Sequence, residues 1–165
     1  MRKYLYSLII CFVLTLPVFA QTGVEIEVLL SEQAVNYGQA ARFVLQAADV
    51  QDLSPEEAFR FAAEHKWIPE NVAIGDKVRL DGVSLLIMEA FGIRGGLFYS
   101  MVKAPHYAYR ELVYKDIIQG RTDPGMPVSG DFLLFIVGRV LSETDETEPW
   151  DTNDVSYAGI LEALS

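Results

Sequence analysis

The stretch APHYAYRELVYKDIIQGRTDPGMPVSGDFLLFIVGRVL, residues 104–141, predicts a helix, a turn-rich loop and a second helix. Pro105 suits a first helical turn, where its missing N–H group would have no partner in any case. Apolar residues then recur at helical spacing, and the segment GRTDPGMP carries turn-forming residues at nearly every position. A start at Ser129 or Asp131 leads into the apolar run Phe132–Leu141, which predicts a buried helix.

The same pattern occurs fifty residues earlier, without a gap. The coinciding pairs include Pro55 with Pro105, Arg60 with Arg110, Gly75 with Gly125, Val78 with Val128 and Asp81 with Asp131. A partial copy, residues 35–44, aligns with residues 78–87 and supplies only a second helix. Chance similarity between amphipathic helices is the alternative, but Pro, Gly and Asp coincide as well as the apolar positions. The repetition therefore predicts stacked helix-loop-helix units that share one core.

The length of 165 residues and the apolar fraction of 51% allow one folded domain. Residues 1–20 have a basic start, an apolar run and small residues at the end, a pattern typical of a secretory signal peptide. We expect cleavage before Gln21, no transmembrane span afterwards, and a location in the periplasm or cell envelope. Cys11 could indicate a lipoprotein, but the bulky Ile10 before it and the continuing apolar run argue against lipidation.

The charge is −10, and it becomes −12 when the loss of Arg2 and Lys3 leaves 11 basic against 23 acidic residues. The only cysteine is lost with the same segment, so the sequence predicts neither a disulfide framework nor a cysteine site. Nucleic acid and anionic membrane surfaces attract basic proteins, and the acidic charge argues against both. A cationic partner remains open, although an acidic surface also keeps an exported protein soluble.

The segments around the units complete the predicted organisation. Residues 21–33 form an extended lead with a possible short strand, and residues 34–142 form the repeat domain. Residues 143–152 are acidic and predict a solvated linker, and residues 153–165 predict a C-terminal helix that completes the bundle. The apolar insert LFYSMV, residues 97–102, could close the core or form an exposed partner surface, and we expect the core.

Within the units, start and stop signals place the helices. The partial unit predicts a helix at about 37–48. Ser54 with Glu57 predicts a capping box for a helix that runs to about Lys66, with Trp67 closing its end. Asp76 or Arg79 should open the next helix.

The loop DIIQGRTDPGMPV, residues 116–128, resembles the loop of the S-layer homology (SLH) domain. That family's unit is a helix, a Gly-x-x-Asp-Gly loop with proline, and a second helix opened by a Thr-Arg-Ala-Glu-like motif. Ala108-Tyr109 is similar to the aromatic-containing first helix. The likeness covers most of residues 34–142 and is best in the last unit.

The resemblance implies an all-α fold of about three units, packed as one compact pseudo-threefold bundle. It also implies anchoring of an exported protein to a cell-wall polymer or peptidoglycan. The positions of the Thr-Arg-Ala-Glu motif are 36–39, 79–82 and 129–132 here, and none keeps the arginine in place. A guanidinium can bind carboxylates of an anionic polymer in a bidentate way, so its loss separates the expected fold from the expected ligand.

No motif for catalysis, a cofactor or a metal was found in the sequence. His65 and His106 occupy non-matching positions, which favours surface or capping roles over metal ligation. Asp81 and Asp131 occupy equivalent positions, which favours helix capping over a catalytic carboxylate pair. The sequence therefore predicts a protein that is not an enzyme.

Any binding site should lie in the grooves between units, near the starts of the second helices, where helix N–H groups favour an anion. The candidate ligand contacts are Arg79 and Arg121 as basic groups, Tyr37, Trp67 and Tyr107 as stacking rings, and Asp81 and Asp131. Solvated arginines and packing aromatics are the ordinary alternatives. Two functions follow from this sequence: binding of a cell-wall glycan or peptidoglycan, or a periplasmic protein-interaction scaffold that lacks the glycan site.

Overall fold

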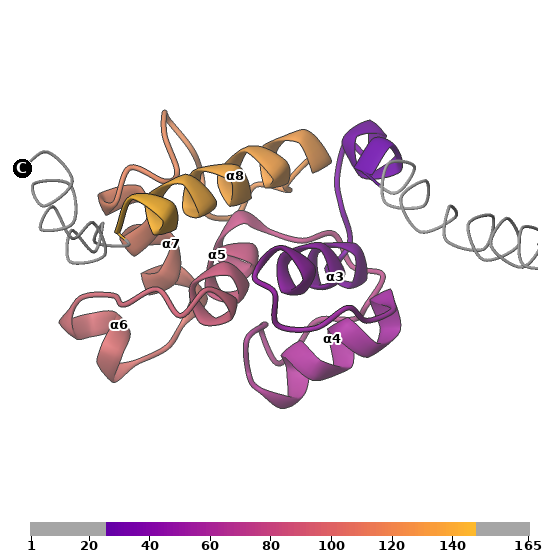
Figure 1. The fold of residues 1–165 in the computed structure, drawn as a ribbon. Coiled ribbons are helices and arrows are strands. Elements are labelled where there is room, and N and C mark those ends of the chain that lie inside the picture. Colours follow the sequence, from indigo (N-terminus) through magenta and orange to yellow (C-terminus); the bar gives the residue numbers. More distant parts are fainter. Residues whose placement is uncertain (1–25, 148–165) are drawn as a thin grey trace, which may run out of the picture.

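The computed structural model describes residues 26–147, which are mostly helical and contain no strand (Figure 1). Its labelled helices are α3 (Tyr37–Ala47), α4 (Pro55–Glu64), α5 (Leu80–Ala90), α6 (Leu97–Met101), α7 (Pro105–Tyr114) and α8 (Gly130–Thr147). The all-α expectation is confirmed for this part of the chain. The predicted signal peptide with Cys11, residues 148–152 of the linker and the predicted helix 153–165 lie outside the described residues.

Residues 26–31 form a helical turn, so the extended lead with a possible strand is wrong for this segment. A lone strand would leave its backbone N–H and C=O groups without a ladder partner, whereas a helix satisfies its own. Leu29 anchors the turn, because it is 7% exposed and its carbonyl lies directly against Gly130 at the start of α8. A side chain on residue 130 would collide with this carbonyl.

Helix α8 continues to Thr147, so the predicted linker is wrong for residues 143–147, which are helical. Once a helix exists, each added residue contributes one backbone hydrogen bond at little cost. No proline or glycine interrupts the sequence between Gly138 and Pro149. The Ser142 hydroxyl also donates to the Gly138 carbonyl at 3.0 Å. The acidic composition of the segment therefore does not end the helix.

The helix starts follow the sequence signals at α3 and α4. The Asn36 side chain accepts from the Gln39 N–H at 2.9 Å, and the Gln39 side chain accepts from the Asn36 N–H at 3.0 Å. Ser54 and Glu57 form the predicted capping box in the same way, at 3.3 and 3.1 Å. Helix α5 differs because Arg79 stands at its N-cap, where it makes no side-chain capping bond.

Four helices end with the same backbone motif, in which one residue adopts a positive φ angle. These residues are Asp49 (52°), Lys66 (59°), Gly92 (62°) and Asp116 (57°), after α3, α4, α5 and α7. At α4 the following Trp67 N–H donates back to the Ala62 carbonyl at 2.8 Å, which is a Schellman ending. Trp67 therefore closes the end of α4, as predicted.

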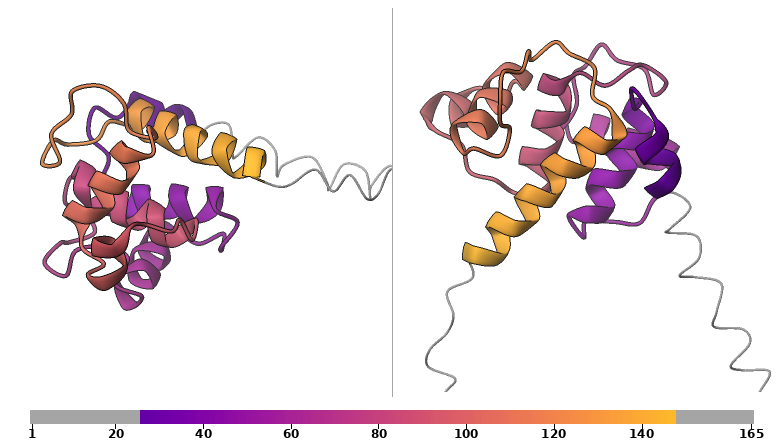
Figure 2. Two further views of the ribbon diagram at one scale, coloured as in Figure 1. Left: turned by 90° about the vertical axis from the view of Figure 1, so that its left-hand side faces the viewer. Right: turned by 90° about the horizontal axis from the view of Figure 1, so that it is seen from above.

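Three valines form a ring of backbone hydrogen bonds in the core. Val35 donates to Val128 at 2.9 Å, Val128 donates to Val78 at 3.1 Å, and Val78 donates to Val35 at 2.9 Å. All three side chains are fully buried. Around this ring, α3 packs against α4 and α5, and α5 packs against α7 (Figures 1 and 2).

The first N–H groups of three helices donate to loop carbonyls rather than to solvent. The bonds join Tyr37 to Asp76 and Gly38 to Ile74 at the start of α3, Leu80 to Met126 and Asp81 to Pro124 at the start of α5, and Gly130 to Glu32 at the start of α8, all between 2.9 and 3.1 Å. Helix N-termini normally carry such groups without intrahelical partners. Here the carbonyls of each loop accept hydrogen bonds from the start of a helix in another part of the chain, and we say that such a loop clasps the helix.

The expectation that the insert LFYSMV closes the core is wrong for most of its residues. In α6 only Tyr99 is buried, at 3% exposed. Its neighbours are largely in solvent: Leu97 is 72% exposed, Phe98 69%, Met101 73% and Val102 54%. A helix of five residues has room to bury one side only, and Tyr99 occupies that side.

Candidate functional site

Tyr37, a predicted ligand contact, is 1% exposed and belongs to the core. Its hydroxyl lies directly against Gly82 of α5, where an added Cβ would collide with it. Burial raises the pKa of Tyr37, and a hydrogen bond with the Arg79 backbone opposes that shift. A ring held in this way cannot stack on a sugar, so the predicted ligand contact at Tyr37 is wrong.

Arg79 and Asp81 lie beside Tyr37, so the structure brings three of the predicted site residues together. The Arg79 guanidinium donates to the Asp81 carboxylate at 3.0 Å. The Arg79 side chain is 59% exposed and also lies near Gly125 of the loop that clasps α5. An ion pair this exposed contributes little stability, because solvent screens it. Asp81 is not the helix cap itself, since it stands in the first turn of α5.

The helix starts in this groove do not offer free N–H groups to an anion. Leu80 and Asp81 donate to the Met126 and Pro124 carbonyls, and Gly38 donates to the Ile74 carbonyl. An anion would have to displace these bonds, and the carbonyl oxygens themselves repel negative charge. The expected anion site at the starts of the second helices is therefore occupied by the protein's own loops.

The remaining predicted contacts lie elsewhere. Trp67 packs with Phe61 and His65 at the end of α4, with ring centroids 5.5 and 5.4 Å away. His65 Nδ1 lies 2.8 Å from the Phe61 carbonyl, which fits the predicted capping role. Arg121 is exposed on the loop between α7 and α8.

Asp131 is an exposed first-turn residue of α8, the position that Asp81 holds in α5. Hydrogen bonds from the Ser129 hydroxyl and the Phe132 backbone N–H hold the pKa of Asp131 below its usual range. A carboxylate in the first turn is favoured by the helix dipole. The geometry therefore agrees with a role at the helix start.

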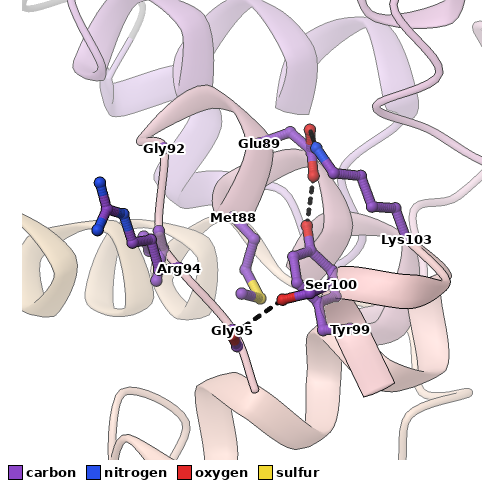
Figure 3. A pocket seen from close by; sticks show the side chains of 9 residues that line it. Met88, Glu89, Gly92, Arg94, Gly95, Tyr99, Ser100 and Lys103 are labelled. Carbon is purple, nitrogen blue, oxygen red and sulfur yellow. Dashed lines mark hydrogen bonds and ion pairs between the residues drawn. The ribbon is translucent and has the colours of Figure 1, made fainter. Parts of the chain in front are cut away.

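A cavity of about 370 Å³, which the sequence did not predict, lies between the end of α5 and α6 (Figure 3). The Glu89 carboxylate is one of the groups that line it. It accepts from the Tyr99 hydroxyl at 2.6 Å and from the Lys103 ammonium at 2.8 Å. Arg94 points away from this carboxylate (Figure 3). The short bond from the buried Tyr99 is the stronger of these two contacts, whereas the Lys103 side chain is 61% exposed and its ion pair contributes little stability.

The cavity's polar groups hold α6 in place rather than activate a nucleophile. Burial raises the pKa of Tyr99, and its hydrogen bond to Glu89 raises it further. The Ser100 hydroxyl donates to backbone carbonyls, with Gly96 at 3.0 Å and Gly95 at 3.3 Å, and so has no base beside it. Tyr99 and Lys103 thus fix α6 to α5 from one side.

The opposite side of α6 presents Leu97, Phe98, Met101 and Val102, which we call the α6 patch. Phe98 stacks on Tyr107 of α7, with ring centroids 6.1 Å apart and planes at 15°. Four large apolar side chains together on one exposed helix are typical of an interaction site. A sequence signal for this patch existed: fifty residues earlier stands AADVQD, so the apolar insert has no counterpart in the other unit.

The stretch of sequence that contains the α6 patch is rich in basic residues. The segment 92–115 contains four basic residues, Arg94, Lys103, Arg110 and Lys115, and only one acidic residue, Glu111. The whole chain has a net charge of −10, so the charge of this segment is opposite in sign to that of the chain. The stretch of chain that carries the α6 patch is therefore both apolar and basic in composition.

Among residues 26–147 there is no group of three or more His, Cys, Asp and Glu side chains that could hold a metal ion. In the same part of the chain, no helix is long and apolar enough to cross a bilayer. Comparisons with protein-family models, with curated proteins and with solved structures gave no match.

Proposed function

We propose that this chain is an exported, non-enzymatic module with an SLH-like arrangement of three units, and that it serves as a protein-interaction scaffold in the periplasm or cell envelope. The valine ring supports the three-unit arrangement, because Val35, Val78 and Val128 are the positions that coincide when the predicted units are aligned. The loop carbonyls that clasp the starts of α3 and α5 support it in the same way.

The observation that carries the scaffold function is the α6 patch. Its four apolar side chains are more than half exposed, while the buried Tyr99 bonds the helix to Glu89 of α5 beneath them. A pre-positioned apolar surface loses little conformational entropy on binding. The partner that fits is a protein with an apolar groove rimmed by carboxylates, because residues 92–115 carry four basic side chains and one acidic side chain.

Binding of a cell-wall polymer or peptidoglycan is the second candidate, and one observation favours it. The Arg79 side chain is exposed beside Asp81 and Gly125, at a groove between two predicted units. The buried Tyr37 ring and the occupied helix N–H groups weigh against this candidate. The scaffold is therefore the function that the geometry supports best.

A photo-reactive amino acid at Leu97 tests the scaffold function in cells of the protein's own source. We expect a covalent adduct with an envelope protein, and we expect the adduct to vanish when Phe98→Asp is added. Tyr114→Asp is the matched control, since it also replaces an exposed aromatic residue, but one on α7 outside the α6 patch. The adduct should persist in this control and weaken at high salt.

Sedimentation with peptidoglycan sacculi and with anionic vesicles separates the alternatives. The scaffold predicts that the purified protein stays in the supernatant in both assays. Saturable pelleting with sacculi that Arg79→Ala abolishes would instead establish wall binding. Pelleting with vesicles that Phe98→Asp abolishes would show that the α6 patch meets a lipid surface, which would overturn the protein-partner proposal.

A further inference from the structure

The cavity between α5 and α6 has an ion pair in its lining, and this pair has no counterpart in the other proposed units. The Lys103 ammonium lies 2.8 Å from the Glu89 carboxylate, and both residues line the cavity. The positions that match Glu89 hold Gln46 in α3 and Arg139 in α8, so neither of these helices supplies a carboxylate there. A feature that only one unit carries is not explained by the packing that the units share.

The ion pair keeps unused hydrogen-bonding capacity. A carboxylate can accept about four hydrogen bonds, and within residues 26–147 the Glu89 side chain accepts from Tyr99 at 2.6 Å and from Lys103 at 2.8 Å. An ammonium group can donate about three, and the Lys103 side chain is 61% exposed, so its other N–H groups are open to solvent. A ligand can therefore add to this pair without breaking it.

The rest of the lining is largely apolar. Met88 and Tyr99 are 1% and 3% exposed, and Ile93 is half-buried. The Met88 side chain extends from α5 toward α6 (Figure 3). The cavity volume of about 370 Å³ lies within the range of about 300–1,000 Å³ that is usual for small-molecule sites. An apolar lining with a few polar groups placed together is typical of such sites.

The charges in the lining select the class of ligand. The two charges of the ion pair cancel, and the third charged residue, Arg94, points away from the Glu89 carboxylate (Figure 3). A ligand with only a positive charge would be attracted by Glu89 but repelled by Lys103, and a ligand with only a negative charge would meet the reverse. A molecule that carries both charges can lie antiparallel to the ion pair and be attracted at both ends.

We propose that this cavity binds a free amino acid with an apolar side chain. The ammonium group of the ligand donates to the Glu89 carboxylate, its carboxylate accepts from the Lys103 ammonium, and its side chain packs against Met88 and Ile93. The two charged groups of an amino acid are attached to the same carbon atom, so they are close enough together to face both members of the ion pair. The proposal does not rest on a protein partner at the α6 patch, and its test uses the purified protein alone.

The test titrates L-leucine, at millimolar concentration, into isotope-labelled protein and follows the backbone amide signals by NMR. We expect saturable shifts in the loop 92–96 and in α6. Isoamylamine is leucine without its carboxylate, and isocaproate is leucine without its ammonium group. Each should bind about tenfold or more weakly than leucine, because one charge of the ion pair loses its partner on the ligand. Glycine has both charges but no apolar side chain, and it should also bind more weakly.

Lys103→Ala separates a ligand contact from a structural role. The Lys103 side chain is 61% exposed and its ion pair contributes little stability, so the melting temperature should stay close to that of the parent. The affinity for leucine should fall by about tenfold, whereas the affinity for isoamylamine should rise, because Lys103 no longer repels its ammonium group. Lys77→Ala is the matched control, since it removes the same charge from an exposed position outside the cavity. It should leave both affinities unchanged.

Three results would overturn the proposal. One is the absence of saturable shifts when leucine is added to the folded parent protein. Another is binding of isoamylamine or isocaproate to the parent as tightly as leucine, which would mean that a single charge is sufficient. The third is an equal loss of leucine affinity in Lys103→Ala and Lys77→Ala, which would indicate an effect of net charge alone. Failure of the scaffold function would instead appear as a missing Leu97 adduct and would not change these titrations.

Discussion

The valine ring and the α6 patch are both built from apolar side chains, yet they have opposite environments. Val35, Val78 and Val128 are fully buried, and their backbones bond to one another in a closed ring. Leu97 and Phe98 are about 70% exposed on a five-residue helix. The valines recur at matching positions of the predicted units, whereas the insert LFYSMV occurs once.

The comparison suggests how to separate structure from function in this chain. The valines that match between the proposed units serve packing, because such units would need the same apolar face to share one core. The single apolar insert is not required for a shared core. Because its side chains are exposed, they add nothing to the stability of the fold. If this distinction is right, substitutions in the two regions should differ strongly in their effect on folding.

Val78→Asp should have the largest effect on stability. It places a carboxylate at the centre of the ring, with no counter-charge, and should lower the free energy of unfolding by about 4 kcal/mol or more. That is a large share of a typical total of about 5–15 kcal/mol, so we expect the variant to be mostly unfolded. Val78→Thr keeps the shape and should cost about 1–3 kcal/mol. Urea unfolding followed by circular dichroism measures both, and a Val78→Thr variant as stable as the parent would contradict the account.

Tyr99→Phe should come next, because it removes the short hydrogen bond that anchors α6 to Glu89. Loss of a bond to a charged partner should cost about 1.5–3 kcal/mol. The pKa of Tyr99 is raised in the folded protein, so its neutral form stabilises the fold below the ordinary tyrosine value of about 10. This contribution is lost as the pH rises above that value, because the unfolded chain ionises first. Stability should therefore fall more steeply above pH ~10 in the parent than in Tyr99→Phe, measured by unfolding at stepped pH.

How far the sequence predicts this structure depends on whether a residue obeys a local rule. The capping box at Ser54 and the closing role of Trp67 depend on neighbours within a few positions, and both were predicted correctly. The box at Asn36 obeys the same local rule but was not predicted. The burial of Tyr37 depends on Gly82, which is distant in sequence, so composition could not reveal it. The exposure of the other α6 side chains likewise depends on Tyr99, because Tyr99 occupies the only buried face of this short helix.

The candidate site was predictable only in part for the same reason. Alignment of the units pointed to the starts of the second helices, where Arg79, Asp81 and Tyr37 lie, but it could not show that loop carbonyls already bond the helix N–H groups there. Glu89 and Lys103 are fourteen positions apart and match no motif, so the anchor beneath α6 had no sequence signal of its own.

Gly82→Ala tests the contact between Tyr37 and α5, with a smaller expected effect. An added methyl group would overlap the buried Tyr37 hydroxyl, at a cost of about 1–3 kcal/mol, and the better helix propensity of alanine offsets about 1 kcal/mol of this. We expect a net loss of about 1 kcal/mol, which Tyr37→Phe should relieve because it removes the overlapping atom. Gly75→Ala is the control, since nothing lies near its Cβ position. A double-mutant cycle by urea unfolding that shows no coupling would disprove the contact.

Phe98→Asp should have the smallest effect on stability, within about 0.5 kcal/mol of the parent, although it replaces a large apolar residue by a charge. The reason is that Phe98 is 69% exposed and its main contact is a ring stack on Tyr107, so little apolar area returns to water. The same substitution is expected to abolish the Leu97 adduct, which gives two readouts with opposite outcomes for one variant. A loss of about 2 kcal/mol or more would mean that Phe98 belongs to the core, and adduct loss would then report unfolding. Unchanged stability together with a lost adduct would leave interaction as the reason this chain keeps an apolar surface in water.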